Sequence, residues 1–188
     1  MLSIINKGTG AGGKNTNING YDFENYTNNE ERLLEMGFEE YMIEENNCIF
    51  LKKSFRKYDI IFLKQYNFIS YLDYFYQIET FRKPDEAYIY EKKDRILNIK
   101  IIEKKAQHHK GSVETKLWAA PSLKKEYELI TGMDIEYCLC LNNFLKNKIL
   151  SPHLKYKTLK KILNDEEILV LFGDDDDYFD YLDEYIFD

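Results

Sequence analysis

The sequence predicts an α/β protein with a mixed central sheet and flanking helices. Two β-type runs, 47–54 and 58–64, stand near stretches whose apolar residues recur at helical spacing. A chain of 188 residues can build one core of ordinary size and is too short for two full domains. We therefore expect a single domain, with a Gly/Asn-rich arm at 1–26, a core at 27–142 and a helical, acidic portion at 143–188.

The first helix is predicted at 27–36. Thr27 provides its N-cap, acidic residues occupy its first turn, and Gly37 ends it. Beyond the two β-type runs, the spacing at 68–78 fits either a helix or a strand, and we favour a helix.

A β-hairpin is predicted next. The runs 87–93 and 95–107 have strand-type patterns and meet at a charged turn formed by Lys93 and Asp94. This hairpin brings the start of its first strand and the end of its second strand to the same edge of the sheet.

The rest of the chain alternates between helix and strand. Ser112 can cap a helix to about Thr131, with Glu114 in its first turn, Gly132 at its end and a kink or break at Pro121. The elements expected after it are a strand at 135–143, a basic amphipathic helix at 153–163, a strand at 167–172 and a helix from about Asp177.

The acidic tail is interpreted as part of this last helix. Asp174 to Asp177 are expected to cap and charge its N-terminus. The apolar side chains expected to dock the helix on the domain are Tyr178, Phe179, Leu182, Tyr185 and Ile186.

The net charge of −7 is unevenly distributed along the chain. Residues 1–50 carry 3 basic and 9 acidic side chains, and residues 165–188 carry none and 11. Residues 51–164 carry 23 basic and 13 acidic side chains, a net charge of about +10. Because the field near a surface is set within a Debye length of about 8 Å, a nucleic-acid partner remains open for this basic middle.

Composition argues against secreted and membrane proteins. The three cysteines form no CxxC pair, and their odd number with no signal-like N-terminus points to a reducing cytosol. No apolar run reaches the roughly 18 to 20 residues that span a bilayer. We therefore expect a soluble, cytoplasmic protein with no membrane partner.

The N-terminal segment GTGAGGKNTN has the spacing of a phosphate-binding loop, GxxxxGK. Such a loop needs Ser or Thr after its Lys and a helix directly behind it. Here Asn15 follows Lys14, and the next residues have turn-type composition without a helical period. We therefore expect no nucleotide cofactor.

The second strand of the hairpin ends in acidic and basic residues. Strand side chains alternate between faces, so Ile102 and Lys104 share one face. The other face presents, in order, Ile101, Glu103, Lys105 and Gln107. Asp85 precedes the first strand, and a twisted hairpin can bring it beside Glu103, which assembles two carboxylates and one ammonium.

This grouping is suited to phosphodiester hydrolysis. Neighbouring carboxylates repel each other unless a cation lies between them, and Mg²⁺ prefers oxygen ligands. A metal on Asp85 and Glu103 lowers the pKa of a bound water and neutralises charge on the phosphate during in-line attack. Lys105 can orient or help deprotonate that water, or stabilise the pentavalent phosphate. We therefore predict Mg²⁺ as the cofactor, with Mn²⁺ as a substitute.

The pairs Pro84–Asp85 and Glu103–Lys105 resemble the PD and ExK motifs of the PD-(D/E)XK nuclease superfamily. The order of predicted elements over roughly 27–142 is similar to the restriction-endonuclease-like core of that family, which comprises a helix, a three-stranded meander, a helix and a strand. The resemblance implies that Asp85 and Glu103 bind metal and that Lys105 is catalytic.

The segments EKKAQHHKGSVETKL and GTGAGGKNTNING look most like restriction-type endonucleases and their viral or phage relatives. This narrower resemblance implies a bacterial, phage or viral homodimer that cuts double-stranded DNA at a short sequence. It also implies a further metal carboxylate from the first helix, for which Glu24 is preferred over Glu30 and Glu31. Two alternatives stay open: a structure-selective junction or repair nuclease, and an inactive nucleic-acid-binding or interaction module.

Further residues are predicted near the substrate. Gln107 is expected to hold a metal-bound water or a phosphate. His108 and His109 have no further His or Cys at ligand spacing, so zinc is not expected. The 16 Tyr and 12 Phe residues are interpreted as core and dimer-interface side chains. The candidates for DNA contacts are Lys14, Asn15, Thr16, Asn17, His108, Lys110, Ser112 and Lys116.

Overall fold

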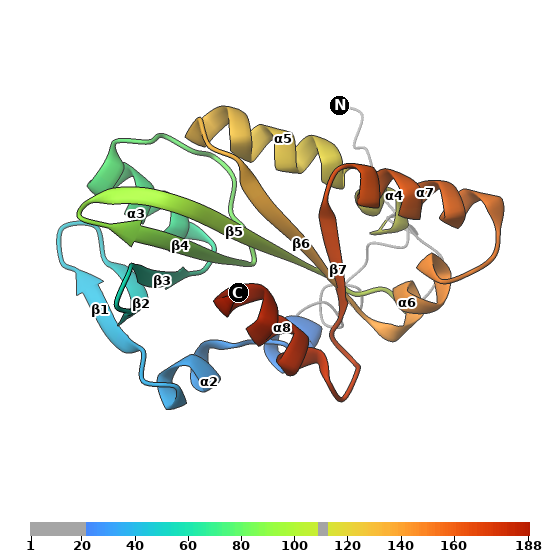
Figure 1. Ribbon diagram of the computed structural model, residues 1–188, viewed down its shortest axis with the longest axis horizontal. Helices are drawn as coiled ribbons and strands as arrows, with labels where there is room; N and C mark the ends of the chain where they lie inside the picture. Colours follow the sequence, from blue (N-terminus) through green and yellow to red (C-terminus); the bar gives the residue numbers. More distant parts are fainter. Residues whose placement is uncertain (1–21, 109–112) are drawn as a thin grey trace, which may run out of the picture.

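A seven-stranded mixed sheet forms the centre of the computed structural model, which describes residues 22–108 and 113–188 (Figure 1). The strands lie in sequence order across the sheet. From β1 to β5 each strand is antiparallel to the next, whereas β5, β6 and β7 are parallel. Their bounds are β1 Glu39–Ile43, β2 Cys48–Ser54, β3 Asp59–Leu63, β4 Glu86–Lys92, β5 Arg95–Lys105, β6 Ile135–Leu141 and β7 Ile168–Phe172. The predicted α/β class with a mixed sheet is confirmed.

Helices cover both faces of the sheet, because its central strands are apolar on both sides. In β5, Ile101 belongs to one buried cluster and Ile102 to the other, as strand alternation requires. The cluster containing Ile101 is covered by α3 Tyr66–Tyr76, α4 Val113–Trp118, α5 Ala120–Thr131, α6 Asn143–Ile149 and α7 Leu154–Asp165. The cluster containing Ile102 is covered by residues 22–26, α2 Glu30–Glu35 and α8 Tyr178–Phe187.

Several predicted boundaries are confirmed by backbone geometry. Lys93 and Asp94 have φ angles of 50° and 60°, which form the tight turn between β4 and β5. Gly132 ends α5 in the left-handed region, and the break between α4 and α5 falls just before Pro121. The helix favoured for 68–78 is confirmed as α3, which begins two residues earlier and ends at Tyr76.

The first helix begins later than predicted. Thr27 does not cap it, because the Thr27 hydroxyl donates to the Phe23 carbonyl and closes the helical turn at 22–26. The helix starts at Glu30, with Asn29 at the N-cap position. Asn29 uses its side chain elsewhere, donating to the Tyr88 hydroxyl and accepting from Arg32.

The predicted role of the acidic residues before the last helix also needs correction. Asp174 adds to the Asn142 N-cap of α6, because its Oδ2 accepts from the Asn143 backbone N–H at 2.6 Å. Asp175 binds Lys146 of the same helix through both oxygens at 2.6 Å. The side chains of these two acids therefore bind α6. Asp177 does occupy the N-cap position of α8, although it makes no side-chain cap hydrogen bond there. The docking of α8 itself is confirmed, because Tyr178, Leu182 and Ile186, spaced four residues apart, are buried.

Two short elements escaped the sequence interpretation. Strand β1 exposes its first four residues and therefore has no alternating pattern. Helix α6 is only seven residues long. In the described part of the chain, no helix has the length and apolarity needed to cross a membrane.

Candidate functional site

The start of β4 and the end of β5 meet at one edge of the sheet. Glu86 pairs with Ile102 in the antiparallel register, so the preceding residue, Asp85, lies opposite Glu103. Asp85 Oδ2 accepts a hydrogen bond of 2.7 Å from the backbone N–H of Lys104, and this bond fixes the carboxylate against β5. The predicted approach of Asp85 to the end of β5 is confirmed.

Lys105 joins the two carboxylates. Its Nζ lies 2.6 Å from Glu103 Oε2 and 3.4 Å from Asp85 Oδ2. The three side chains are only 13 to 16% exposed, so their charges interact in a poorly solvated setting. The structure thus brings together Glu103 and Lys105, which strand alternation places on one face, and Asp85, which the hairpin was expected to bring beside them.

Burial shapes the protonation of this group. It raises the pKa of Glu103 above its usual range, and the neighbouring Asp85 carboxylate adds to the rise, although Lys105 opposes it. Burial by itself would lower the pKa of Lys105. The negative charges of Glu103 and, to a smaller extent, Asp85 have the larger effect, so the pKa of Lys105 is raised. Lys105 is therefore held as an ammonium.

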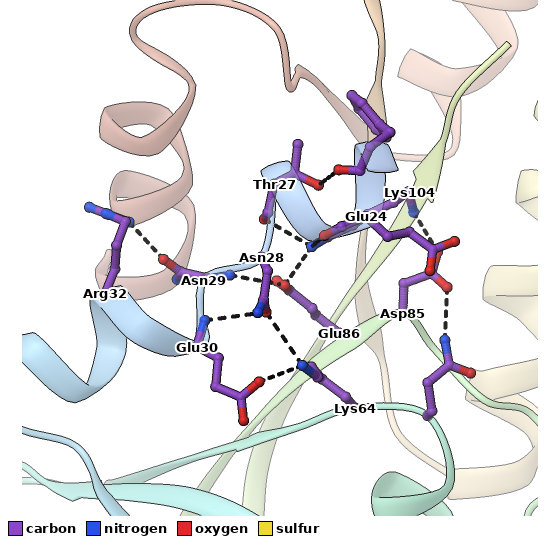
Figure 2. Close-up of polar contacts among 12 residues, drawn as sticks. Glu24, Thr27, Asn28, Asn29, Glu30, Arg32, Lys64, Asp85, Glu86 and Lys104 are labelled. Carbon is purple, nitrogen blue, oxygen red and sulfur yellow. Dashed lines mark hydrogen bonds and ion pairs between the residues drawn. The ribbon is translucent and has the colours of Figure 1, made fainter. Parts of the chain in front are cut away.

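Glu24 approaches the same edge from the helical turn at 22–26. It lines a pocket of about 270 Å³ together with Asp85, and Figure 2 shows the two carboxylates pointing toward one another. Partial burial of its carboxylate and the charge of Asp85 raise the pKa of Glu24, while Lys105 and Lys104 lower it. Neither Glu30 nor Glu31 is placed here: Glu30 forms an ion pair with Lys64, and Glu31 is exposed on α2.

A buried ion pair supports the position of Glu24. Lys104 Nζ lies 2.6 Å from Glu86 Oε1, with the two side chains 3% and 1% exposed. Lys104 also donates to the Thr27 carbonyl at 2.9 Å and the Glu24 carbonyl at 3.5 Å (Figure 2). A cation at the C-terminal carbonyls of a helical turn stabilises it, so this pair attaches the segment carrying Glu24 to β5.

The sequence interpretation did not identify this pair. Alternation correctly placed Lys104 on the face opposite Glu103, but the partner Glu86 had no signal of its own. A lysine predicted to point into a core requires a buried acid nearby, and that requirement could have directed attention to Glu86.

Gln65 was also missed. Its Nε2 donates to Asp85 Oδ1 at 3.0 Å, and its backbone N–H donates to the Pro84 carbonyl at 2.9 Å. Gln65 has φ 50° and ψ −121°, a conformation that side-chain-bearing residues rarely adopt. The strained turn before α3 thus supports Asp85 from the side opposite β5.

The metal prediction is only partly reflected in the side-chain arrangement. Among residues 22–108 and 113–188, no three or more His, Cys, Asp or Glu side chains are grouped closely enough to hold a metal ion. Glu24 therefore does not complete a three-carboxylate set with Asp85 and Glu103.

The remaining predicted residues lie in different places. Gln107 follows the end of β5, which stops at Lys105 and not at 107, and its backbone is bonded to the Asn142 side chain in a buried position. His108 and Lys116 are exposed. The DNA-contact candidates outside the described residues are Lys14, Asn15, Thr16, Asn17, Lys110 and Ser112.

Comparison of the chain with protein-family models, with curated proteins and with solved structures finds no match in any of the three.

Proposed function

We propose that this protein is a metal-dependent nuclease that hydrolyses phosphodiester bonds of double-stranded DNA. The observation that carries the proposal is the convergence of Asp85, Glu103 and Lys105, with distances of 2.6 and 3.4 Å from the ammonium to the two carboxylates. Its support from the fold is the antiparallel run β3, β4 and β5, followed by α4, α5 and the parallel strand β6. The helix α3 between β3 and β4 departs from the uninterrupted meander that the PD-(D/E)XK resemblance implies.

The donor set fits Mg²⁺. This ion is commonly held by one or two carboxylates and keeps several waters, so Asp85 and Glu103 suffice and Glu24 can bind such a water. When bound, Mg²⁺ supplies charge neutralisation for the phosphate and an acidified water. Mn²⁺, which takes similar ligands, is expected to substitute.

The protein side chains have separate roles in this proposal. Asp85 is oriented by Gln65 and by the Lys104 N–H, and it lines the pocket of about 270 Å³. Lys105 stabilises negative charge that develops on the phosphate, because its raised pKa keeps it charged. The neighbouring basic residue Lys83, which lies 3.5 Å above the Tyr66 ring, is available to bind a phosphate of the DNA backbone.

The resemblance to restriction-type enzymes also leads us to propose that the protein acts as a homodimer that cuts at a short sequence. Light scattering coupled to gel filtration measures the mass directly. A mass of twice the 22.5 kDa chain supports the dimer, and a monomer at micromolar concentration contradicts it without affecting the nuclease proposal.

The activity is tested by incubating supercoiled plasmid with the protein and Mg²⁺ or Mn²⁺. We expect nicking and linearisation, and a loss of about 100-fold or more in Glu103→Gln and in Lys105→Met. Glu35→Gln is the matched control, since Glu35 is exposed on α2 away from the site. If the wild type cuts no faster than Glu103→Gln with either metal, the nuclease proposal fails.

The pattern of products distinguishes a site-specific nuclease from a non-specific one, a structure-selective one and an inactive module. Discrete bands indicate a site-specific enzyme, and a smear indicates a non-specific one. Cleavage of a branched four-way DNA but not of plasmid indicates a structure-selective nuclease. Binding of DNA without any cleavage indicates an inactive module of the same fold.

A further inference from the structure

A second pocket, of about 380 Å³, lies at the opposite end of β4 from Asp85. We call it the aromatic pocket. It is formed where β1, β2 and α3 meet the β4–β5 turn, and the candidate nuclease site uses none of its residues. Its lining residues are Tyr41, Phe50, Lys52, Tyr71, Phe75, Tyr76, Glu91 and Asp94.

The walls of the aromatic pocket are linked rings. Tyr41 stacks on Phe50 with a centroid distance of 5.6 Å, and the Phe50 ring is 5.1 Å from that of Tyr71. Tyr71 in turn contacts Phe75 at 4.6 Å. Phe50 and Tyr71 are buried, whereas Tyr41 and Phe75 are 43% and 49% exposed, so rings at the mouth are accessible to a ligand.

The hydroxyl protons of these tyrosines are already committed to carboxylates. Tyr71 and Tyr76 both donate to Glu91 Oε2, at 2.9 and 2.6 Å, and Tyr41 donates to Glu39 at 2.8 Å. Burial and the Glu91 charge raise the pKa of Tyr71 and Tyr76, so both phenols stay neutral. The phenol oxygens therefore offer acceptor lone pairs to a ligand, and the rings offer their π faces.

Two carboxylates, from Glu91 and Asp94, and one ammonium, from Lys52, line the pocket. Lys52 is held by Asp59 at 2.8 Å and by Glu91 at 3.2 Å, so its ammonium is neutralised by two acids. Asp94 adds an exposed carboxylate at the rim. Acceptor oxygens, π faces and the surplus of one carboxylate over the ammonium in the lining all attract a cation and repel an anion.

We propose that the aromatic pocket binds an alkylammonium group, carried either by a free polyamine or by a lysine side chain of a partner. The ammonium contacts the open faces of Tyr41 and Phe75 and the Asp94 carboxylate, and the alkyl chain lies on the rings. This site is independent of the nuclease proposal, because it uses different residues at the other end of β4.

The test is titration of the full-length protein with spermidine and, separately, with Nα-acetyl-lysine methylamide. Aromatic ¹H–¹³C spectra report the ring resonances of the pocket, and calorimetry reports the affinity. We expect saturable shifts of pocket rings with at least one cation and none with 1-pentanol, an uncharged analogue. Binding of spermidine alone assigns the site to free polyamines, and binding of both assigns it to a lysine side chain as well.

Two variants test the residues. Phe75→Ala should weaken binding by about threefold to thirtyfold, the usual range for loss of a cation–π contact. Asp94→Asn should weaken it by about twofold to fivefold. It should not disturb the turn, because Asn tolerates the positive φ of 60° found there.

Matched controls lie elsewhere on the surface. Tyr181→Ala removes an exposed ring of α8, and Asp176→Asn removes an exposed charge before that helix. Neither should change the affinity. The proposal is overturned if no cation saturates the shifts, if 1-pentanol binds as well, or if Phe75→Ala and Asp94→Asn bind like the controls.

Discussion

Gln65 combines backbone strain with a contact to the candidate site. A residue with a side chain at φ 50°, ψ −121° carries a cost of about 1 to 3 kcal/mol. This backbone conformation places the side-chain Nε2 of Gln65 at 3.0 Å from Asp85 Oδ1. Gln65→Gly should therefore raise the unfolding free energy by about 1 kcal/mol and lower cleavage about tenfold, because Asp85 loses a charge-assisted hydrogen bond. Urea titration and plasmid cleavage measure the two effects.

Gln77→Gly is the control for this prediction. Gln77 ends α3 with φ 54° and ψ 32°, and glycine is favoured at such a position. It should stabilise the protein by a similar amount and leave cleavage unchanged. Equal cleavage by both variants would mean that Gln65 has no part in positioning Asp85.

Glu24 provides a pH-dependent prediction. Its pKa in the folded protein is raised above the ordinary 4.5, so the folded state binds a proton that the unfolded chain has lost. Its contribution to stability is most favourable below the ordinary pKa and is lost as pH rises through the raised value. Glu24→Gln should thus have the melting temperature of the wild type near about pH 4 and a higher one near about pH 8.

Thermal melts of Glu24→Gln at both pH values check this. Glu35→Gln, an exposed change of the same kind, should show no difference that depends on pH. A stabilisation by Glu24→Gln of equal size at both pH values would contradict the raised pKa of Glu24 as its cause.

At the level of elements, the Lys104–Glu86 pair links β4, β5 and the helical turn at 22–26. Removing one partner leaves an uncompensated buried charge, so Lys104→Met should destabilise the protein by about 3 to 5 kcal/mol. Adding Glu86→Gln should recover much of this loss, because the amide oxygen can still accept from the Asn29 N–H. Chemical denaturation of the two single variants and the double variant measures the coupling.

The exposed pair Lys161–Asp165 is the control for burial. Its side chains are 74% and 58% exposed, and Lys161→Met should change stability by no more than about 1 kcal/mol. If Lys104→Met costs as little as Lys161→Met, the buried pair does not anchor the helical turn.

The elements that could be predicted from the sequence are those whose regularly spaced apolar residues are buried in the core. β3 and β6 bury almost every residue, and α7 buries Tyr156, Leu159 and Leu163 at helical spacing. β1 could not be found this way, because it is defined by its pairing with β2 and not by burial. The start of α6 depends on Asn142, whose side chain also bonds the distant Gln107.

The same distinction holds at the candidate site. Glu103 and Lys105 share a face through local alternation, and Asp85 joins them through the register of one hairpin, so sequence alone places all three. Gln65 reaches Asp85 through a turn before α3, and Glu24 reaches it through a helical turn anchored by Lys104. Those contacts depend on tertiary packing, which no local pattern encodes.

At the scale of the whole molecule, charge is divided between the two faces of the sheet. On one face, α6 and α7 carry six lysines, which are Lys146, Lys148, Lys155, Lys157, Lys160 and Lys161. α2 and α8, on the other face, are mainly acidic. Glu114 of α4 pairs with Lys155, which joins the N-terminal turns of α4 and α7 beyond the edge where β5 ends. DNA at the candidate site should therefore extend over α4 and α7 and away from α8.

Binding of duplex DNA to this surface should depend on salt concentration. Each phosphate contact adds about 0.9 to the slope of log affinity against log salt. Lys116→Gln with Lys157→Gln removes two exposed lysines of α4 and α7, so it should weaken duplex binding and reduce the slope by about 1.8. Binding is measured in a Glu103→Gln background, so that the duplex is not cut during the titration.

Arg56→Gln with Lys57→Gln is the matched control, because it removes the same charge from the exposed β2–β3 turn. That turn lies at the opposite end of the sheet from Asp85, since Asp59 pairs with Glu91. A diffuse field from the basic middle would make both double variants weaken binding alike. A localised surface makes the slope fall for the α4–α7 variant alone, because counterions are released only where phosphates touch lysines.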